Sequence, residues 1–169
     1  NPVQLYGPNN GTFFMLPFPV GDFFYVPNPN FYGHDTIIIS ICDNGLPLPV
    51  LCTNDTIFIT VDPVNDAPIT FNEFAVTFEN VPYSGNVLLN GDYDIETGTT
   101  LTASVVLVAG PSNGTFSILP NCDYTYTPSL LFNGFDMVVV SICDNGYPLP
   151  AECTNDTIFI TVDPVNDAP

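Results

Sequence analysis

The stretch ITVDPVNDAP occupies residues 59–68 and recurs unchanged at residues 160–169. The sequence around it is repeated as well, because residues 40–68 and 141–169 differ at only three positions. The differences are Leu46/Tyr147, Val50/Ala151 and Leu51/Glu152. Self-similarity with a period of about a hundred residues is typical of tandem domains, so the repeat predicts two domains of one kind.

The two copies are of unequal length. PNNGTF at residues 8–13 matches PSNGTF at 111–116, so the first copy starts at a point equivalent to about residue 104. We therefore predict an incomplete domain over residues 1–68, which lacks its first strands, and a complete domain over 69–169. Either the chain is an excerpt from a longer array, or strands of a neighbouring subunit complete the first domain.

Alternating apolar residues predict the strands of both copies. An extended segment with this pattern places its apolar residues on one face. The residues with this alternation are Ile37, Ile39 and Ile41, then Ile57, Ile59 and Val61, with equivalents Val138, Val140, Ile142, Ile158, Ile160 and Val162. Further strands are predicted over residues 75–79, 101–108, 114–119 and 124–127. No segment has a convincing 3.6-residue period, so we predict all-β sandwich domains with little helix.

The charge of the chain excludes several classes of function. It has 18 acidic residues, no lysine, no arginine and one histidine, for a formal net charge of -18. Nucleic-acid binding requires basic side chains that displace counterions from phosphates, and an anionic membrane surface would repel the chain. We therefore expect no nucleic-acid partner, no membrane insertion, and neutralisation of the carboxylates by bound cations.

The cysteines follow the repeat. Cys42 and Cys52 are ten positions apart, and Cys143 and Cys153 keep that spacing. Without the spacing of a zinc site, these pairs predict one disulfide per domain and an oxidising compartment, with buried thiols as the alternative. Cys122 has no counterpart, so it is either a buried thiol or a link to another chain.

Three motifs carry a resemblance to a known family. They are TFENVPYSGNVLLNGDYDIETGTTL at residues 77–101, YTPSLLFNGFDMVVVSICDNG at 126–146, and ITVDPVNDAP. In this order and spacing they resemble the cadherin-like repeats of giant bacterial surface adhesins, particularly the gliding-motility adhesins of Bacteroidota. The resemblance implies Ig-like sandwiches joined end to end outside the cell, as the stalk or filament of an adhesin at the cell surface. It also implies calcium between repeats.

The residues themselves suggest calcium ligands. Asp62, Asn65 and Asp66 cluster in the repeated connector, and Asp92, Asp94 and Glu96 alternate in one loop. Ca2+ prefers carboxylate, amide and carbonyl oxygens, although Asp and Asn also simply form turns. The resemblance adds Glu79, as the acidic residue that family members place on the strand leading toward the preceding junction. We predict Ca2+ at residues 62–66 together with Glu79 or Asp92.

The resemblance also implies covalent sugar. Proteins of Bacteroidota carry O-glycans at Asp, then Ser or Thr, then an aliphatic residue. This pattern is matched at Thr36, Thr56 and Thr157, each within the sequence DTI. Because DT is also common at the start of a strand, the matches are short sequence predictions.

Alternative functions lead to different expectations. A carbohydrate-binding module would use exposed aromatic side chains, and a filament subunit would assemble by strand exchange. The candidate aromatic residues are Phe23, Phe24, Tyr25, Phe31 and Tyr32. Enzymatic activity is not expected, because His34 is the only histidine and Phe135 stands in its place in the second copy. We expect a structural repeat module whose partners are neighbouring repeats.

Overall fold

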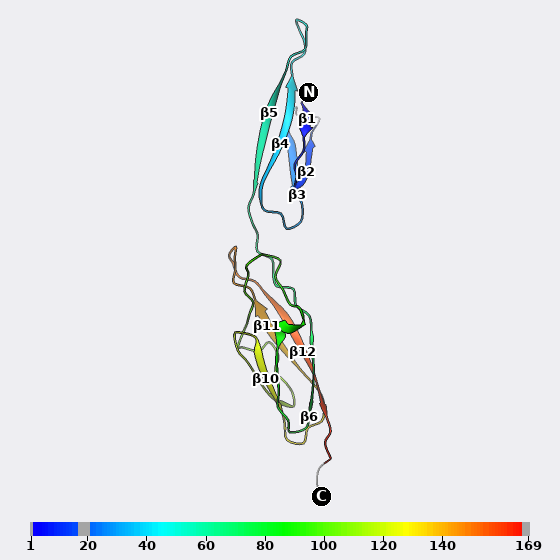
Figure 1. Cartoon of the computed structure of the whole chain (residues 1–169), viewed down its shortest axis with the longest axis vertical. Helices are drawn as coiled ribbons and strands as arrows, with labels where there is room; N and C mark the ends of the chain where they lie inside the picture. Colours follow the sequence, from blue (N-terminus) through cyan, green and yellow to red (C-terminus); the bar gives the residue numbers. More distant parts are fainter. Residues whose placement is uncertain (1, 17–20, 167–169) are drawn as a thin grey trace. The chain divides into compact units, whose positions relative to one another are not determined.

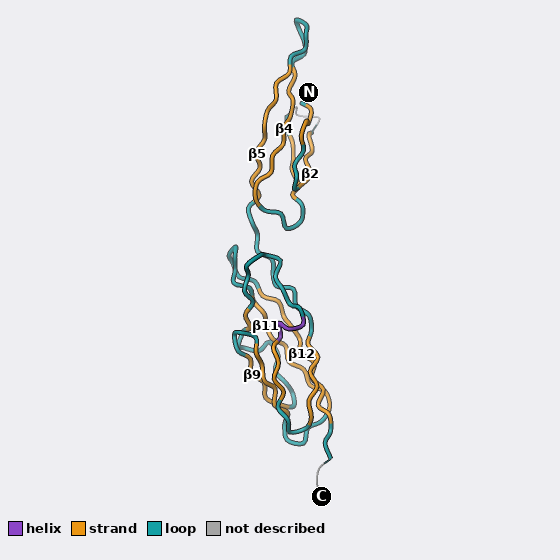
Figure 2. The backbone as a smooth tube through the Cα atoms, viewed as in Figure 1, coloured by secondary structure: helices purple, strands orange, loops and turns teal. Residues whose placement is uncertain are grey.

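The computed structural model describes residues 2–16 and 21–166. The chain divides into two compact units, Asn1–Pro63 and Val64–Pro169. The predicted all-β class is confirmed, and one 3-10 turn is the only helix among the described residues (Figure 2). The boundary lies five residues before the predicted one because Asn65 and Asp66 hydrogen-bond to Asp144 and Glu96 of the second unit.

The second unit (Figure 1) is a sandwich of two sheets. One sheet has the order β6 (Glu73–Phe78), β12 (Cys153–Asp163), β11 (Gly134–Cys143) and β8 (Thr102–Ala103). The other has the order β7 (Tyr83–Asn86), β10 (Asp123–Pro128) and β9 (Gly114–Ile118). Alternate residues of both sheets form one buried core, including Tyr126, Ile142 and Ile158.

The first and last strands of this unit, β6 and β12, lie side by side and run parallel (Figure 1). Their register runs from the Glu73–Ile158 pair to the Phe78–Asp163 pair. One more hydrogen bond extends the pairing, since the Glu79 N–H donates to the Asp163 carbonyl at 2.9 Å. The two ends of the unit are thus joined directly through backbone hydrogen bonds.

The described residues of the first unit form five strands. The sheet β1 (Val3–Tyr6), β4 (Gly33–Cys42) and β5 (Cys52–Val61) faces the hairpin of β2 (Gly11–Met15) and β3 (Phe23–Pro27). Its small core consists of Phe13, Ile37 and Ile39 with partly buried neighbours. β5 has the same sequence as the first ten residues of β12, yet among the described residues only β4 pairs with it. Ile57 is therefore only half-buried, whereas its equivalent Ile158 is fully buried.

Both predicted disulfides are confirmed. Cys42 is bonded to Cys52 and Cys143 to Cys153. Each disulfide joins the paired last and first residues of two antiparallel strands, so it closes the proline-rich loop between them.

Cys122 is a free thiol with no exposed surface. Burial raises the pKa of this thiol to about 11. Because the thiolate is the reactive form, native protein should not react with a maleimide or an aromatic disulfide reagent at about pH 8. Addition of guanidinium chloride should release one reactive thiol per chain. Rapid labelling of native protein would contradict this prediction.

Most predicted strands are present, but the strand over residues 101–108 is wrong. Only Thr102–Ala103 forms a strand there; beyond it the segment keeps isolated backbone contacts with β11, including a bridge between Ala109 and Val139. The reason is local, because the Ser104 hydroxyl accepts from the Val106 N–H and donates to the Val106 carbonyl. A serine that bonds to nearby backbone in this way competes with strand pairing.

None of the described residues lies in a helix long and apolar enough to cross a membrane.

Candidate metal centres

Asn65 and Asp66, at the start of the second unit, lie close to three carboxylates. The Asn65 amide donates to Asp144 Oδ2 at 2.8 Å, and the Asp66 N–H donates to Glu96 Oε1 at 3.3 Å. The Glu96 N–H in turn donates to Asp94 Oδ1 at 2.9 Å. We call these five residues, Asn65, Asp66, Asp94, Glu96 and Asp144, the end cluster.

The end cluster offers oxygen ligands to a cation. Asn65 Oδ1, Asp94 Oδ2 and Glu96 Oε2 are buried and have no hydrogen-bond partner among the described residues. The adjacent Asp94 carboxyl, together with burial, raises the pKa of Glu96 to about 7. Oxygen atoms of this kind fit a hard cation such as Ca2+.

Sequence reasoning missed Asp144 as part of this group. Its Oδ1 accepts from the Gly146 N–H at 2.6 Å and from the Glu152 N–H at 3.1 Å. These are the bonds expected of Asp in a turn. The sequence Asp-Asn-Gly therefore signals only the turn, and the contact with Asn65 depends on the fold.

Asp92 lies in a different group of carboxylates, together with Glu73 and Asp156. Glu73 and Asp156 were not identified from the sequence as candidate metal ligands. Glu73 begins β6, Asp92 follows the 3-10 turn Val87–Asn90, and Asp156 lies on β12. One carboxylate oxygen from each lies within 4.8 Å of the others. We call Glu73, Asp92 and Asp156 the buried triad.

Each carboxylate of the buried triad is held by a hydrogen bond to one of its oxygens. The second oxygen of each, Glu73 Oε2, Asp92 Oδ2 and Asp156 Oδ2, is buried and has no partner among the described residues. The donors to the first oxygens are Asn90 Nδ2 to Glu73 at 2.8 Å, the Phe71 N–H to Asp92 at 2.8 Å and the Thr157 N–H to Asp156 at 2.7 Å.

Burial raises the pKa of all three carboxyl groups of the buried triad. For Glu73, burial and the adjacent Asp156 raise the pKa to about 9. For Asp156, burial raises it to about 6, and for Asp92 burial is again the largest cause of a raised pKa. The ionised triad is therefore unfavourable unless a positive charge neutralises it.

The predicted grouping of Glu79 with residues 62–66 is wrong. Glu79 Oε1 accepts from Asn133 Nδ2 at 3.0 Å and from the Val165 N–H at 3.2 Å, beyond the end of β12. The end cluster lies beside the start of this 11-residue strand. At about 3.3 Å per residue, the two ends are roughly 33 Å apart. Asp62 directly follows β5 and belongs to the first unit.

The three threonines predicted to carry glycan differ in exposure. Thr56 is exposed, whereas Thr36 and Thr157 are half-buried. In each case the backbone N–H donates to the carboxylate of the preceding aspartate. Glycosylation of these three threonines stays a prediction.

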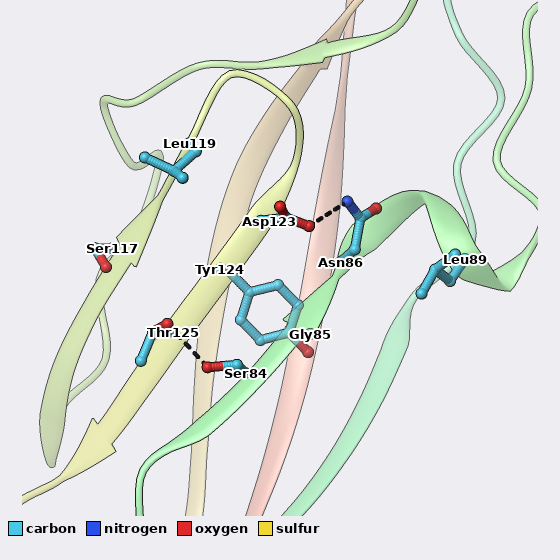
Figure 3. A pocket seen from close by; sticks show the side chains of 9 residues that line it. All are labelled: Ser84, Gly85, Asn86, Leu89, Ser117, Leu119, Asp123, Tyr124 and Thr125. Carbon is cyan, nitrogen blue, oxygen red and sulfur yellow. Dashed lines mark hydrogen bonds between the residues drawn. The ribbon is translucent and has the colours of Figure 1, made fainter.

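An open pocket of about 520 Å³ lies on the sheet of β7, β9 and β10 (Figure 3). Its polar side chains bond to one another, with Ser84 to Thr125 at 3.0 Å and Asn86 to Asp123 at 2.7 Å. The ring of Tyr124 lies against Gly85 and is only 4% exposed. It therefore offers little surface for stacking on a sugar.

The aromatic residues predicted for sugar binding lie in the first unit. The Phe23 ring packs against Phe13 with centroids 5.2 Å apart, and Phe24 stacks on Phe14 at 4.7 Å. Both Phe23 and Phe24 are more than 40% exposed. These contacts show pairing within the hairpin and do not by themselves define a sugar site.

Solved structures of cadherin repeats share the fold. Mouse cadherin-23 EC22-24 is 17% identical with a TM-score of 0.59, over 95% of this chain and 53% of that chain. Protocadherin gamma B2 extracellular cadherin domains 1-5 are 16% identical with a TM-score of 0.57, over 99% of this chain and 33% of that one. The chain thus spans a third to about half of the length of these structures.

Sequence comparison gives the family. No curated protein sequence matches the chain. The model of the bacterial Ig domain family matches residues 65–161, which is more than half of the chain and nearly all of the second unit. The chain therefore belongs to the bacterial Ig domain family.

Proposed function

We propose that the chain is a load-bearing repeat segment from the stalk of a long adhesin at the cell surface. The observation that carries this proposal is the parallel pairing of β6 with β12. Bacterial Ig and cadherin-like folds suggest an extracellular, adhesion-type repeat. The two disulfides agree with an oxidising compartment.

The strand pairing resists tension applied to the two ends of the second unit. Such a force pulls β6 and β12 in opposite directions along their own axes. Because backbone hydrogen bonds lie across the strands, all bonds of the parallel pair bear the load together. An antiparallel hairpin pulled at its open end instead loses its bonds one after another.

Calcium at the end cluster would add to this resistance. Asn65, Asp66, Asp94 and Glu96 bring oxygen atoms from the connector and from a loop of the second unit to one place. A cation there would join the connector to the sandwich, and Asp62 remains a predicted ligand. Glycan on Thr36, Thr56 and Thr157, neighbouring repeats as partners and a role in gliding motility belong to the same proposal.

Single-molecule force spectroscopy tests the proposal. In the full chain, handles at residues 64 and 166 load β6 against β12 in shear. Handles at residues 133 and 166 pull the antiparallel strands β11 and β12 apart at their open end, where Gly134 pairs with Val162, and serve as the control. We expect a clearly higher unfolding force for the first pair, and a further increase when Ca2+ replaces EGTA. Equal or lower force for the first pair would contradict a load-bearing role.

A further inference from the structure

The buried triad poses a charge problem that the second unit does not solve by itself. Glu73 is 9% exposed and Asp156 is 1% exposed, yet each has a buried oxygen without a partner among the described residues. The chain has no lysine or arginine, and its one histidine, His34, belongs to the first unit. Buried carboxylates require a positive partner or protonation. Either a cation or shared protons must therefore neutralise the triad.

The geometry favours a cation. One shared proton joins only two of the three carboxylates, so satisfying the whole triad with protons requires at least two of them. One cation can contact all three carboxylates at once, because one oxygen from each lies within 4.8 Å of the others. The hydrogen bonds to the other oxygens already hold the three carboxylates in place. Because the side chains are already held, binding a cation would cost less conformational entropy.

The chemistry of the ligands indicates the kind of cation. The triad contains carboxylate oxygens only, without the imidazole or thiolate groups that zinc and copper prefer. Ca2+ accepts irregular sets of oxygen ligands, whereas Mg2+ demands a near-octahedral set and keeps several waters. A buried, uneven group of carboxylates therefore suits Ca2+ better.

We propose that Glu73, Asp92 and Asp156 bind a divalent cation of the Ca2+ type inside the second unit, at a site separate from the end cluster. The ion would connect β6, β12 and the loop after the 3-10 turn, which are the elements that carry the three ligands. It would reduce the formal charge of the site from -3 to about -1. This site would exist whether or not the unit bears load, so it goes beyond the proposed function.

The first unit contains a natural control for the site. Asp55 holds the position in β5 that Asp156 holds in β12, within the same sequence, and it accepts from the Thr56 N–H at 2.8 Å. Asp55 is nevertheless exposed, and no second group of this kind occurs among the described residues. Asp156→Asn and Asp55→Asn thus make the same chemical change, the first inside the buried triad and the second at an equivalent position that has no triad.

Calcium titration of the full chain tests the proposal. Wild-type protein, Asp156→Asn, Glu73→Gln and Asp55→Asn are titrated with CaCl2 by calorimetry, and their Tm values are measured in CaCl2 and in EGTA. Asp156→Asn and Glu73→Gln should each bind one Ca2+ fewer per chain than wild type and Asp55→Asn, and show a smaller Ca2+-induced rise in Tm. In EGTA both should melt above wild type, because an amide removes a carboxyl group that, without a cation, must be buried either as an anion or at the cost of protonation.

Two comparisons keep the outcome decisive. Equal Ca2+ stoichiometry in all four proteins would overturn the proposal, because the triad would then be neutralised by protons. Glu96→Gln should lose only calcium held at the end cluster and keep the triad ion. Glu73→Gln provides an independent measurement if Asp156→Asn fails to fold.

Discussion

Replacing Asp136 with alanine should lower the free energy of unfolding of the second unit by about 3 to 4 kcal/mol. Asp136 is 8% exposed. Its two oxygens accept four hydrogen bonds, three of them part-buried and the one from Tyr126 buried, and alanine would remove the acceptor of all four. The donors are the Ser112 N–H at 2.8 Å, the Asn113 N–H at 2.8 Å, the Met137 N–H at 3.0 Å and the Tyr126 hydroxyl at 3.1 Å. Denaturant titration with pulsed labelling of Cys122 measures the loss, because this thiol reports the second unit alone.

The chain offers matched controls for this change. Asp35 makes the same contacts in the first unit, where hydrogen bonds from Asn9, Asn10, Thr36 and Tyr25 outweigh burial and lower its pKa. Asp35→Ala should therefore leave the labelling transition of Cys122 unchanged. Asp123→Ala removes an exposed carboxylate of the second unit and should cost less than about 1 kcal/mol. If Asp136→Ala lowers the free energy of unfolding no more than Asp123→Ala does, the four hydrogen bonds to the Asp136 carboxylate do not stabilise the unit.

The strands of the sandwich could be predicted from sequence because their signal is local. Alternation in residues 36–41 and 56–61 indicates the face that enters the core, and in the structure Ile37 and Ile39 of β4 are buried there with Ile57 and Ile59 of β5 packed against them. Strand β8 is short because one side chain, Ser104, binds its neighbouring backbone. Alternation of apolar residues indicates which side chains are buried, but it does not reveal that a serine side chain competes for the backbone hydrogen bonds of a strand.

The buried triad could not be predicted because its residues meet only through non-local pairing. Asp156 lies in the motif DTI, which indicates a strand start or a glycosylation site. Glu73 comes close to it because β6 pairs with β12 in parallel, with Ile158 opposite Glu73. Parallel strands are joined by long connections and not by a short turn, so the register between β6 and β12 cannot be predicted from the sequence of either strand. Asn65 and Asp66 were predicted because their clustering is visible in the connector itself.

In the presence of a chelator, the second unit should become less stable as the pH rises from about 6 to about 9. The folded-state pKa of Glu73 is raised to about 9 by burial and by Asp156. An unfolded glutamate has a pKa near 4.3, so the folded state holds this proton more tightly. The resulting stability is fully present below the unfolded pKa and is lost as the pH rises through the folded pKa. Asp156, with a pKa of about 6, contributes in the same direction at the lower end of this range.

Thermal unfolding in EGTA at a series of pH values measures this trend, and variants identify its source. Glu96, whose pKa is raised to about 7, titrates in the same range, so Glu96→Gln should remove only part of the slope. Glu73→Gln should remove most of it, because the amide has no proton to lose. Excess Ca2+ should flatten or reverse the slope in wild type, since the cation replaces the departing protons. Identical slopes for wild type and Glu73→Gln would mean that Glu73 is not the group that the fold keeps protonated.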